Sequence, residues 1–60
     1  MKFDEKGQRQ LVANINAVRE ETGHTRTRIS GSKWTMVRWL WDKAHNPREF
    51  RVWFKVEMGW

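Results

Sequence analysis

The sequence predicts a small α+β domain whose elements follow the order α-β-α-β. Two segments carry apolar residues at helical spacing, and a long segment near the C-terminus alternates between apolar and polar residues. A chain of 60 residues suffices for only one domain, so we expect residues 1–60 to fold as a single unit. We expect two helices to pack on a small two-stranded sheet, which dimerisation could extend.

The first predicted element is a helix over residues 8–22. One stripe of this helix is formed by Leu11, Ile15 and Val18, which are four and three positions apart. Gly23 favours a helix end at residue 22, because glycine adopts the left-handed conformation at low cost. Gly7 leaves the start open, because glycine destabilises a helix interior by about 1 kcal/mol relative to alanine.

Residues 25–29 form the second predicted element, a short strand. The segment alternates and is rich in β-branched residues. Thr25, Thr27 and Ile29 would share one face, and Arg26 and Arg28 the other. An irregular loop is the alternative, because five residues are few.

The third predicted element is a helix over residues 33–45. Ser30 or Ser32 can cap it by accepting free backbone N–H groups, and Asn46 before Pro47 ends it. Its apolar arc comprises Trp34, Met36, Val37, Leu40, Trp41 and Ala44. Trp39 lies outside this arc, so core packing explains it least well.

The last predicted element is a strand over residues 48–58. One face would carry Phe50, Val52, Phe54, Val56 and Met58, and the other Arg51, Trp53, Lys55 and Glu57. An exposed strand of this length invites pairing with another chain, so we expect at least weak dimerisation. A helix-turn-helix with a C-terminal wing is the competing fold. It is weakened because no short helix is apparent between residues 23 and 31.

The predicted core combines residues from all the longer elements. It comprises Leu11, Ile15, Val18, Val37, Leu40, Trp41, Val52 and Phe54. Trp41 is expected to be structural, because it lies well inside the apolar arc. Trp39 and Trp53 are expected to bind a ligand and to contribute little to stability.

Composition excludes several functions. The chain has no cysteine, and therefore neither a disulfide nor a cysteine-based metal site. No apolar run approaches the roughly 18 residues of a membrane span, and residues 1–5 lack the apolar core of a signal peptide. We therefore expect a cytoplasmic protein that does not enter a membrane. The two histidines lack metal-ligand spacing, and no nucleophile–base pair stands out. We expect no metal, no cofactor and no enzymatic activity.

Charge is distributed unevenly along the chain, whose formal net charge is +5. Residues 1–23 hold four basic and four acidic side chains, whereas residues 24–60 hold eight basic and three acidic ones. Four of the five tryptophans also lie between residues 34 and 53. Such a basic and aromatic surface suits nucleic acid.

The leading functional hypothesis is therefore a small, basic nucleic-acid-binding protein, with a regulatory role as one option. Trp53 between Arg51 and Lys55 resembles the stacking and charge neutralisation of single-strand binders. That Trp53 instead covers a second packing layer is an equally weighted alternative. The predicted binding residues are Arg26, Arg28, Lys33, Arg38, Trp39, Lys43, Arg48, Arg51, Trp53 and Lys55. We expect micromolar or weaker affinity that falls with salt.

Two further features of residues 30–45 have more than one interpretation. The turn Ser30-Gly31-Ser32-Lys33 can bind phosphate at a helix N-terminus, although an ordinary capped turn is the stronger interpretation. The cationic, tryptophan-rich helix after it resembles helices that lie in a membrane interface. That remains a minor alternative, because its apolar arc is needed for the core.

The second functional hypothesis is a modulator or inhibitor of another, acidic protein. Exposed tryptophan and arginine side chains would then be interface hot spots. Cations that converge on one face would favour nucleic acid, and a compact patch of tryptophan and arginine would favour the modulator.

Overall fold

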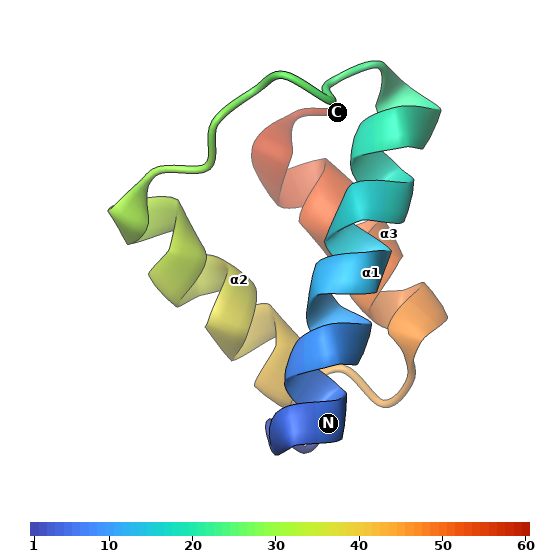
Figure 1. The fold of residues 1–60 in the computed structure, drawn as a ribbon, viewed down its shortest axis with the longest axis vertical. Helices are drawn as coiled ribbons and strands as arrows, with labels where there is room; N and C mark the ends of the chain where they lie inside the picture. Colours follow the sequence, from blue (N-terminus) through green and yellow to red (C-terminus); the bar gives the residue numbers. More distant parts are fainter.

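Three helices and no strand make up the chain in the computed structural model, which describes residues 1–60. They are α1 (Glu5–Thr22), α2 (Gly31–Lys43) and α3 (Pro47–Met58). Helix α3 contacts both other helices, and α2 spreads away from α1 toward the loop of residues 23–30 that connects them (Figure 1). The predicted α+β class is therefore wrong, and the domain is all-helical.

Helix α1 begins three residues earlier than the sequence suggests and ends where predicted. The side chain of Asp4 accepts a hydrogen bond from the Gly7 backbone N–H at 2.8 Å, which caps the first turn. At the other end Gly23 has a φ of 75°, the left-handed conformation that favours glycine. Capping by Asp4 stabilises the first turn and so allows the helix to include Gly7.

The predicted strand over residues 25–29 is wrong, and the alternative, a loop, is what the structure contains. The Thr27 N–H donates to the His24 carbonyl at 3.1 Å, which turns the chain. No neighbouring strand is present to pair with this segment, because residues 48–58 are helical. Ile29 is buried, whereas Arg26 and Arg28 are exposed.

Helix α2 matches the predicted element with shifted ends. Ser30 is the N-cap and accepts a long hydrogen bond of 3.4 Å from the Lys33 N–H. The helix therefore begins at Gly31 and ends at Lys43, because Ala44 is already extended with a ψ of 141°. The choice of Ser30 over Ser32 as the cap is thereby settled.

The long strand predicted over residues 48–58 is wrong, because this segment is helix α3. Asn46 caps it by accepting a hydrogen bond from the Glu49 N–H at 2.9 Å, and Pro47 takes the first helical position. Gly59, with a φ of 73°, ends it. Loss of the strand also removes the exposed edge that led us to expect dimerisation.

A helical period changes which residues of this segment share a face. Phe50 and Phe54 are one helical turn apart and fully buried, and Met58, one turn further, packs against the core. Val52 and Val56 would share their face in a strand but are 48% and 74% exposed. The placement of Val52 in the core is therefore wrong.

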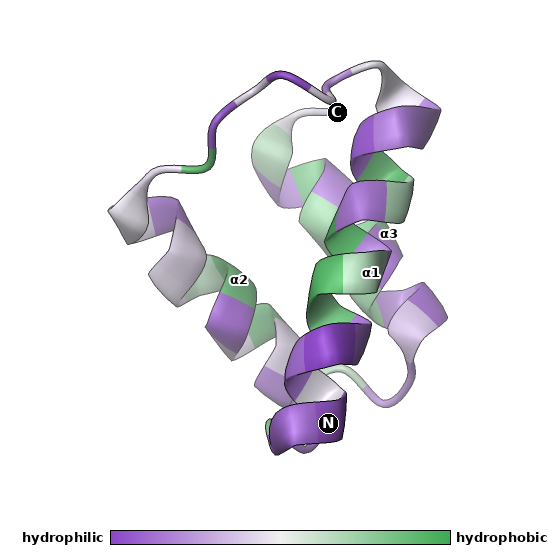
Figure 2. Ribbon diagram, in the orientation of Figure 1, coloured by the Kyte–Doolittle hydropathy of each residue, from purple (hydrophilic) through white to green (hydrophobic).

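The core lies where the three helices meet. The other seven predicted core residues are buried, together with three more. The buried hydrophobic residues are Leu11, Ile15, Val18, Ile29, Val37, Leu40, Trp41, Ala44, Phe50 and Phe54. Trp41 packs edge-on to Phe50 with ring centres 5.2 Å apart. Hydrophilic residues predominate along the loop of residues 23–30 and the outer helix faces (Figure 2).

Candidate functional site

The ten predicted binding residues do not form a single face. On helix α3, Arg51 and Trp53 are two positions apart. At 100° per residue their side chains therefore point about 160° apart around the helix axis. Arg51 turns toward α1 and donates a hydrogen bond to the Asn14 side chain at 2.5 Å. Lys55 likewise forms an ion pair with Glu21 of α1 at 2.9 Å. The predicted grouping of Trp53 with these two cations is therefore wrong.

Three other predicted cations are also dispersed. The Arg38 guanidinium lies 3.6 Å from the centre of the Phe3 ring and 3.5 Å from the Asp42 carboxylate. Lys33 is exposed in the first turn of α2, and Arg48 is exposed in the first turn of α3. The first turn of α3 lies at the end of the molecule opposite to the loop of residues 23–30 (Figure 1).

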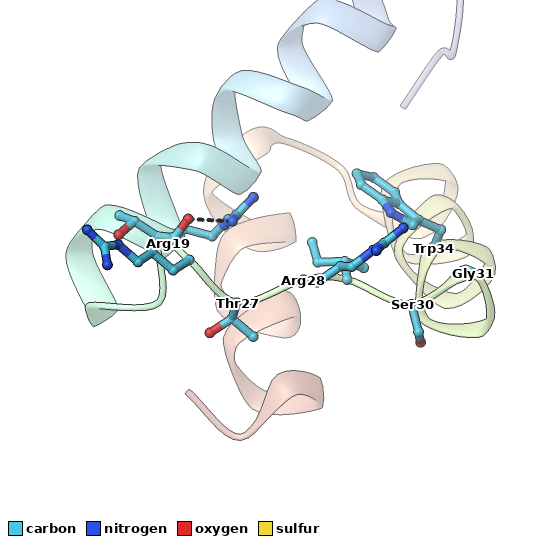
Figure 3. A pocket seen from close by; sticks show the side chains of 9 residues that line it. Arg19, Thr27, Arg28, Ser30, Gly31 and Trp34 are labelled. Atoms are coloured by element: carbon cyan, nitrogen blue, oxygen red, sulfur yellow. Dashed lines mark hydrogen bonds between the residues drawn. The ribbon is translucent and has the colours of Figure 1, made fainter.

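A basic groove at the α1–α2 loop does bring two of the predicted residues together. We call it the arginine groove, and its volume is about 590 Å³. It is lined by Arg19, Thr25, Arg26, Thr27, Arg28, Ile29, Ser30, Gly31 and Trp34. Figure 3 shows Arg28 and Trp34 on one side of it and Arg19 on the other.

Charge in the arginine groove is of one sign. Three arginines and no carboxylate line it. The four ion pairs of the structure involve neither Arg26 nor Arg28, and both side chains are exposed. The two guanidinium groups therefore keep donors free for an anionic ligand, and no carboxylate in the groove lining competes for them.

Arg19 has a structural role in the same groove. Its guanidinium donates hydrogen bonds to the backbone carbonyls of His24, at 3.3 Å, and Thr25, at 2.5 Å, and the second bond is dashed in Figure 3. These bonds tie the loop to the last turn of α1. Arg19 thus positions the loop that carries Arg26 and Arg28, and it adds positive charge behind it.

Two further contacts hold the loop in place. The His24 ring stacks on Trp60 with ring centres 4.3 Å apart, and Trp60 in turn packs edge-on against the buried Phe54. At the far end of the loop the Ile29 side chain is buried in the core. The segment between these anchors is therefore fixed at both ends while its arginine side chains remain exposed.

Trp34 provides the aromatic surface of the arginine groove. Its side chain remains 41% exposed, although helical periodicity places it in the apolar arc. The cause is its position in the first turn of α2, where the helix extends away from α1 (Figure 1). Sequence reasoning missed Trp34 and Arg19 as site residues. The short distance of Trp34 from the capping serine is the signal that could have indicated its exposure.

A second, apolar groove lies between α2 and α3. We call it the tryptophan groove, and its volume is about 320 Å³. It is lined by Trp39, Leu40, Lys43, Trp53, Val56 and Glu57. Three predicted binding residues therefore lie together here, namely Trp39, Lys43 and Trp53. The Lys43 ammonium lies 5.7 Å from the centre of the Trp39 ring.

The arrangement of the titratable groups gives one shifted pKa and no cluster with the composition of a metal site. No group of three or more His, Cys, Asp or Glu side chains could hold a metal ion. Hydrogen bonds from the side chain and the backbone N–H of His45 lower the pKa of Glu49 below its ordinary value of 4.5. This pair lies on the surface at the start of α3, where it supports the helix cap.

Neither a membrane-spanning helix nor a known relative bears on the function of the grooves. None of the three helices combines the length and the apolar character that a membrane crossing requires. The chain matches no protein-family model, no curated protein and no solved structure. A function must therefore be inferred from the residues of the two grooves.

Proposed function

We propose that the protein binds single-stranded nucleic acid in the arginine groove, as a cytoplasmic binding protein and not as an enzyme. The observation that carries this proposal is the composition of the groove: three arginines, an exposed tryptophan and no carboxylate. Guanidinium groups bind phosphate oxygens with paired donors, and an indole face stacks on any base. The combination matches the two chemical parts of a nucleotide.

Trp34 favours a single strand over a duplex. Bases in a duplex are already stacked on their neighbours, whereas an unpaired base can turn onto an aromatic side chain. One such contact contributes about 1–3 kcal/mol. The arginine side chains of the loop that line the groove are also exposed to solvent, which suits a chain that passes across the loop.

A helix-turn-helix mode has less support. Helices α2 and α3 are joined by residues 44–46, a turn of suitable length. The outward face of α3, however, exposes Val52 and Val56, and Arg51 and Lys55 are already bound to α1. A helix that reads the major groove needs free polar side chains on that face.

An acidic protein is the competing ligand, because tryptophan and arginine are also interface hot-spot residues. The two ligands differ in what Trp34 can contact. A base offers a flat ring for stacking, whereas an acidic peptide offers carboxylates that require only the arginines. Poly-glutamate is therefore the appropriate comparison ligand for any titration.

The test is a fluorescence-anisotropy titration of labelled single-stranded oligonucleotides at several salt concentrations. Replacing Arg26 and Arg28 by alanine should weaken binding and reduce the slope of log K against log salt by about 0.7 per lost contact. The matched control replaces Lys6 and Arg48, two exposed cations in the first turns of α1 and α3, away from the loop (Figure 1).

The control separates a site from general positive charge. Each double variant removes two positive charges. An equal loss of oligonucleotide affinity in both variants would therefore contradict a site at the arginine groove. Absence of binding by the unmodified protein at low salt would also refute the proposal. Equal affinity for poly-glutamate and for an oligonucleotide of the same length would favour the acidic protein partner instead.

A further inference from the structure

We propose that the tryptophan groove is the contact surface between two copies of this chain. It is separate from the arginine groove and shares no residue with it, so the inference does not depend on nucleic-acid binding. The starting observation is the exposure of large apolar side chains at one place. Trp39 is 57% exposed and Val56 is 74% exposed, and both line the same groove.

The apolar surface extends beyond the groove itself. Val52 precedes Val56 by one turn of α3 and is 48% exposed. Trp53 lies between these two valines in the sequence and is half-buried. Together with Leu40 it lines the tryptophan groove. Large exposed apolar patches mark interaction sites, and these side chains would form the centre of one.

The charges at the groove favour a second copy over a foreign partner. Lys43 stands on the α2 side and Glu57 on the α3 side, and they form no ion pair with each other. One cation and one anion give the groove no net charge, so it selects neither an acidic nor a basic partner. Across a two-fold axis the same surface faces itself. Lys43 then meets Glu57 of the second copy, and the pairing occurs twice.

The expected association is weak. A standard interface buries about 800 Å² on each partner, which would be close to one fifth of the 4302 Å² that this chain exposes. The tryptophan groove and Val52 supply only the centre of such an area. We expect a dissociation constant on the order of 0.1 mM, equivalent to about 5.5 kcal/mol of binding free energy.

Sedimentation equilibrium over a wide concentration range tests the inference. Val56→Glu places a charge in the apolar patch and should raise the dissociation constant at least about tenfold, because unpaired charges are excluded from interface cores. Val12→Glu is the matched control, since Val12 is a 50% exposed valine of α1 outside the groove. Circular dichroism of both variants verifies that the helices remain.

Charge exchange tests the two-fold arrangement directly. Lys43→Glu alone would place like charges opposite each other at both ends of the interface, and so would Glu57→Lys. Each variant alone should therefore be monomeric. An equimolar mixture of the two restores both pairs and should form a heterodimer.

Three outcomes would overturn the inference. The first is an unmodified chain that remains monomeric at millimolar concentration, which would leave the groove for a different protein. The second is an equal effect of Val56→Glu and Val12→Glu on the dissociation constant. The third is a mixture of Lys43→Glu and Glu57→Lys that associates no better than its components.

Discussion

The indole N–H of Trp41 donates a hydrogen bond to the backbone carbonyl of Lys2 at 2.9 Å. This contact joins a buried residue in the last turn of α2 to the segment that precedes α1. Gly7 makes the approach possible, because a Cβ at this position would lie 2.2 Å from the same carbonyl oxygen. A glycine inside α1, which helical propensity alone disfavours, therefore has a packing cause.

Replacing Gly7 by alanine should destabilise the fold, although alanine normally stabilises a helix interior by about 1 kcal/mol relative to glycine. The clash with Lys2 requires the N-terminal segment to move, and such overpacking costs about 1–3 kcal/mol. Gly31→Ala is the control, because a Cβ there meets nothing within 4 Å. Thermal unfolding of both variants measures the difference. A Gly7→Ala variant as stable as Gly31→Ala would show that Lys2 does not lie against α1.

The tryptophans should fall into three classes of stability effect. Trp41→Ala should cost about 3–5 kcal/mol, because the ring is fully buried. Trp39→Ala should change the free energy of unfolding by no more than about 0.5 kcal/mol, because its side chain is mainly exposed. Trp53 is half-buried and packs against the core, so its replacement should give an intermediate cost. The expectation that Trp53 contributes little to stability is thus revised. Chemical denaturation of the three variants tests this order.

Stability should depend on pH through Glu49. Because its folded-state pKa is lower than its ordinary value of 4.5, its contribution is present above pH 4.5 and is lost as the pH falls through the folded pKa. His45→Gln should raise the pKa of Glu49 only part of the way, because the backbone N–H of residue 45 still donates to the carboxylate. Carboxyl titration by NMR measures it. His24→Gln is the control and should leave this pKa unchanged.

Trp34→Leu should separate stacking from charge in the arginine groove. Leucine keeps an apolar side chain but offers no aromatic face, so oligonucleotide binding should weaken by about 1–3 kcal/mol. The slope against salt should stay the same, because no phosphate contact is lost. Poly-glutamate binding serves as the control and should not change. An unaltered oligonucleotide affinity would remove the role that we give to Trp34.

The sequence predicts an element correctly where the spacing of its apolar residues is compatible with only one type of secondary structure. The spacing of Leu11, Ile15 and Val18 is compatible only with a helix, and α1 is predicted correctly. In residues 48–58 apolar residues occur at every second position, as in a strand. Phe50 and Phe54 are four positions apart, so they fit the spacing of a helix as well as that of a strand. The decisive signals were local. Asn46 and Pro47 begin a helix as well as end one, and Gly59 ends it.

The same ambiguity limits what the sequence predicts about the site. Arg26 and Arg28 were assigned correctly as exposed cations, because a loop and an edge strand both expose them. Arg51 and Lys55 were grouped with Trp53 because faces were assigned with a period of two. Trp34 lines the arginine groove because α2 diverges from α1. The residue pattern within one helix does not predict how two helices diverge.

Chemical-shift mapping of the ¹⁵N-labelled protein with a short single-stranded oligonucleotide locates the nucleic-acid site on the molecule. If the strand binds in the arginine groove, the shifts should concentrate in the loop of residues 25–31 and at the Trp34 indole N–H. Residues of α3 distant from the loop, such as Arg48 and Val52, should remain unaffected. Shifts that centre on Trp39 and Trp53, or that spread over all exposed cations, would contradict binding in the arginine groove.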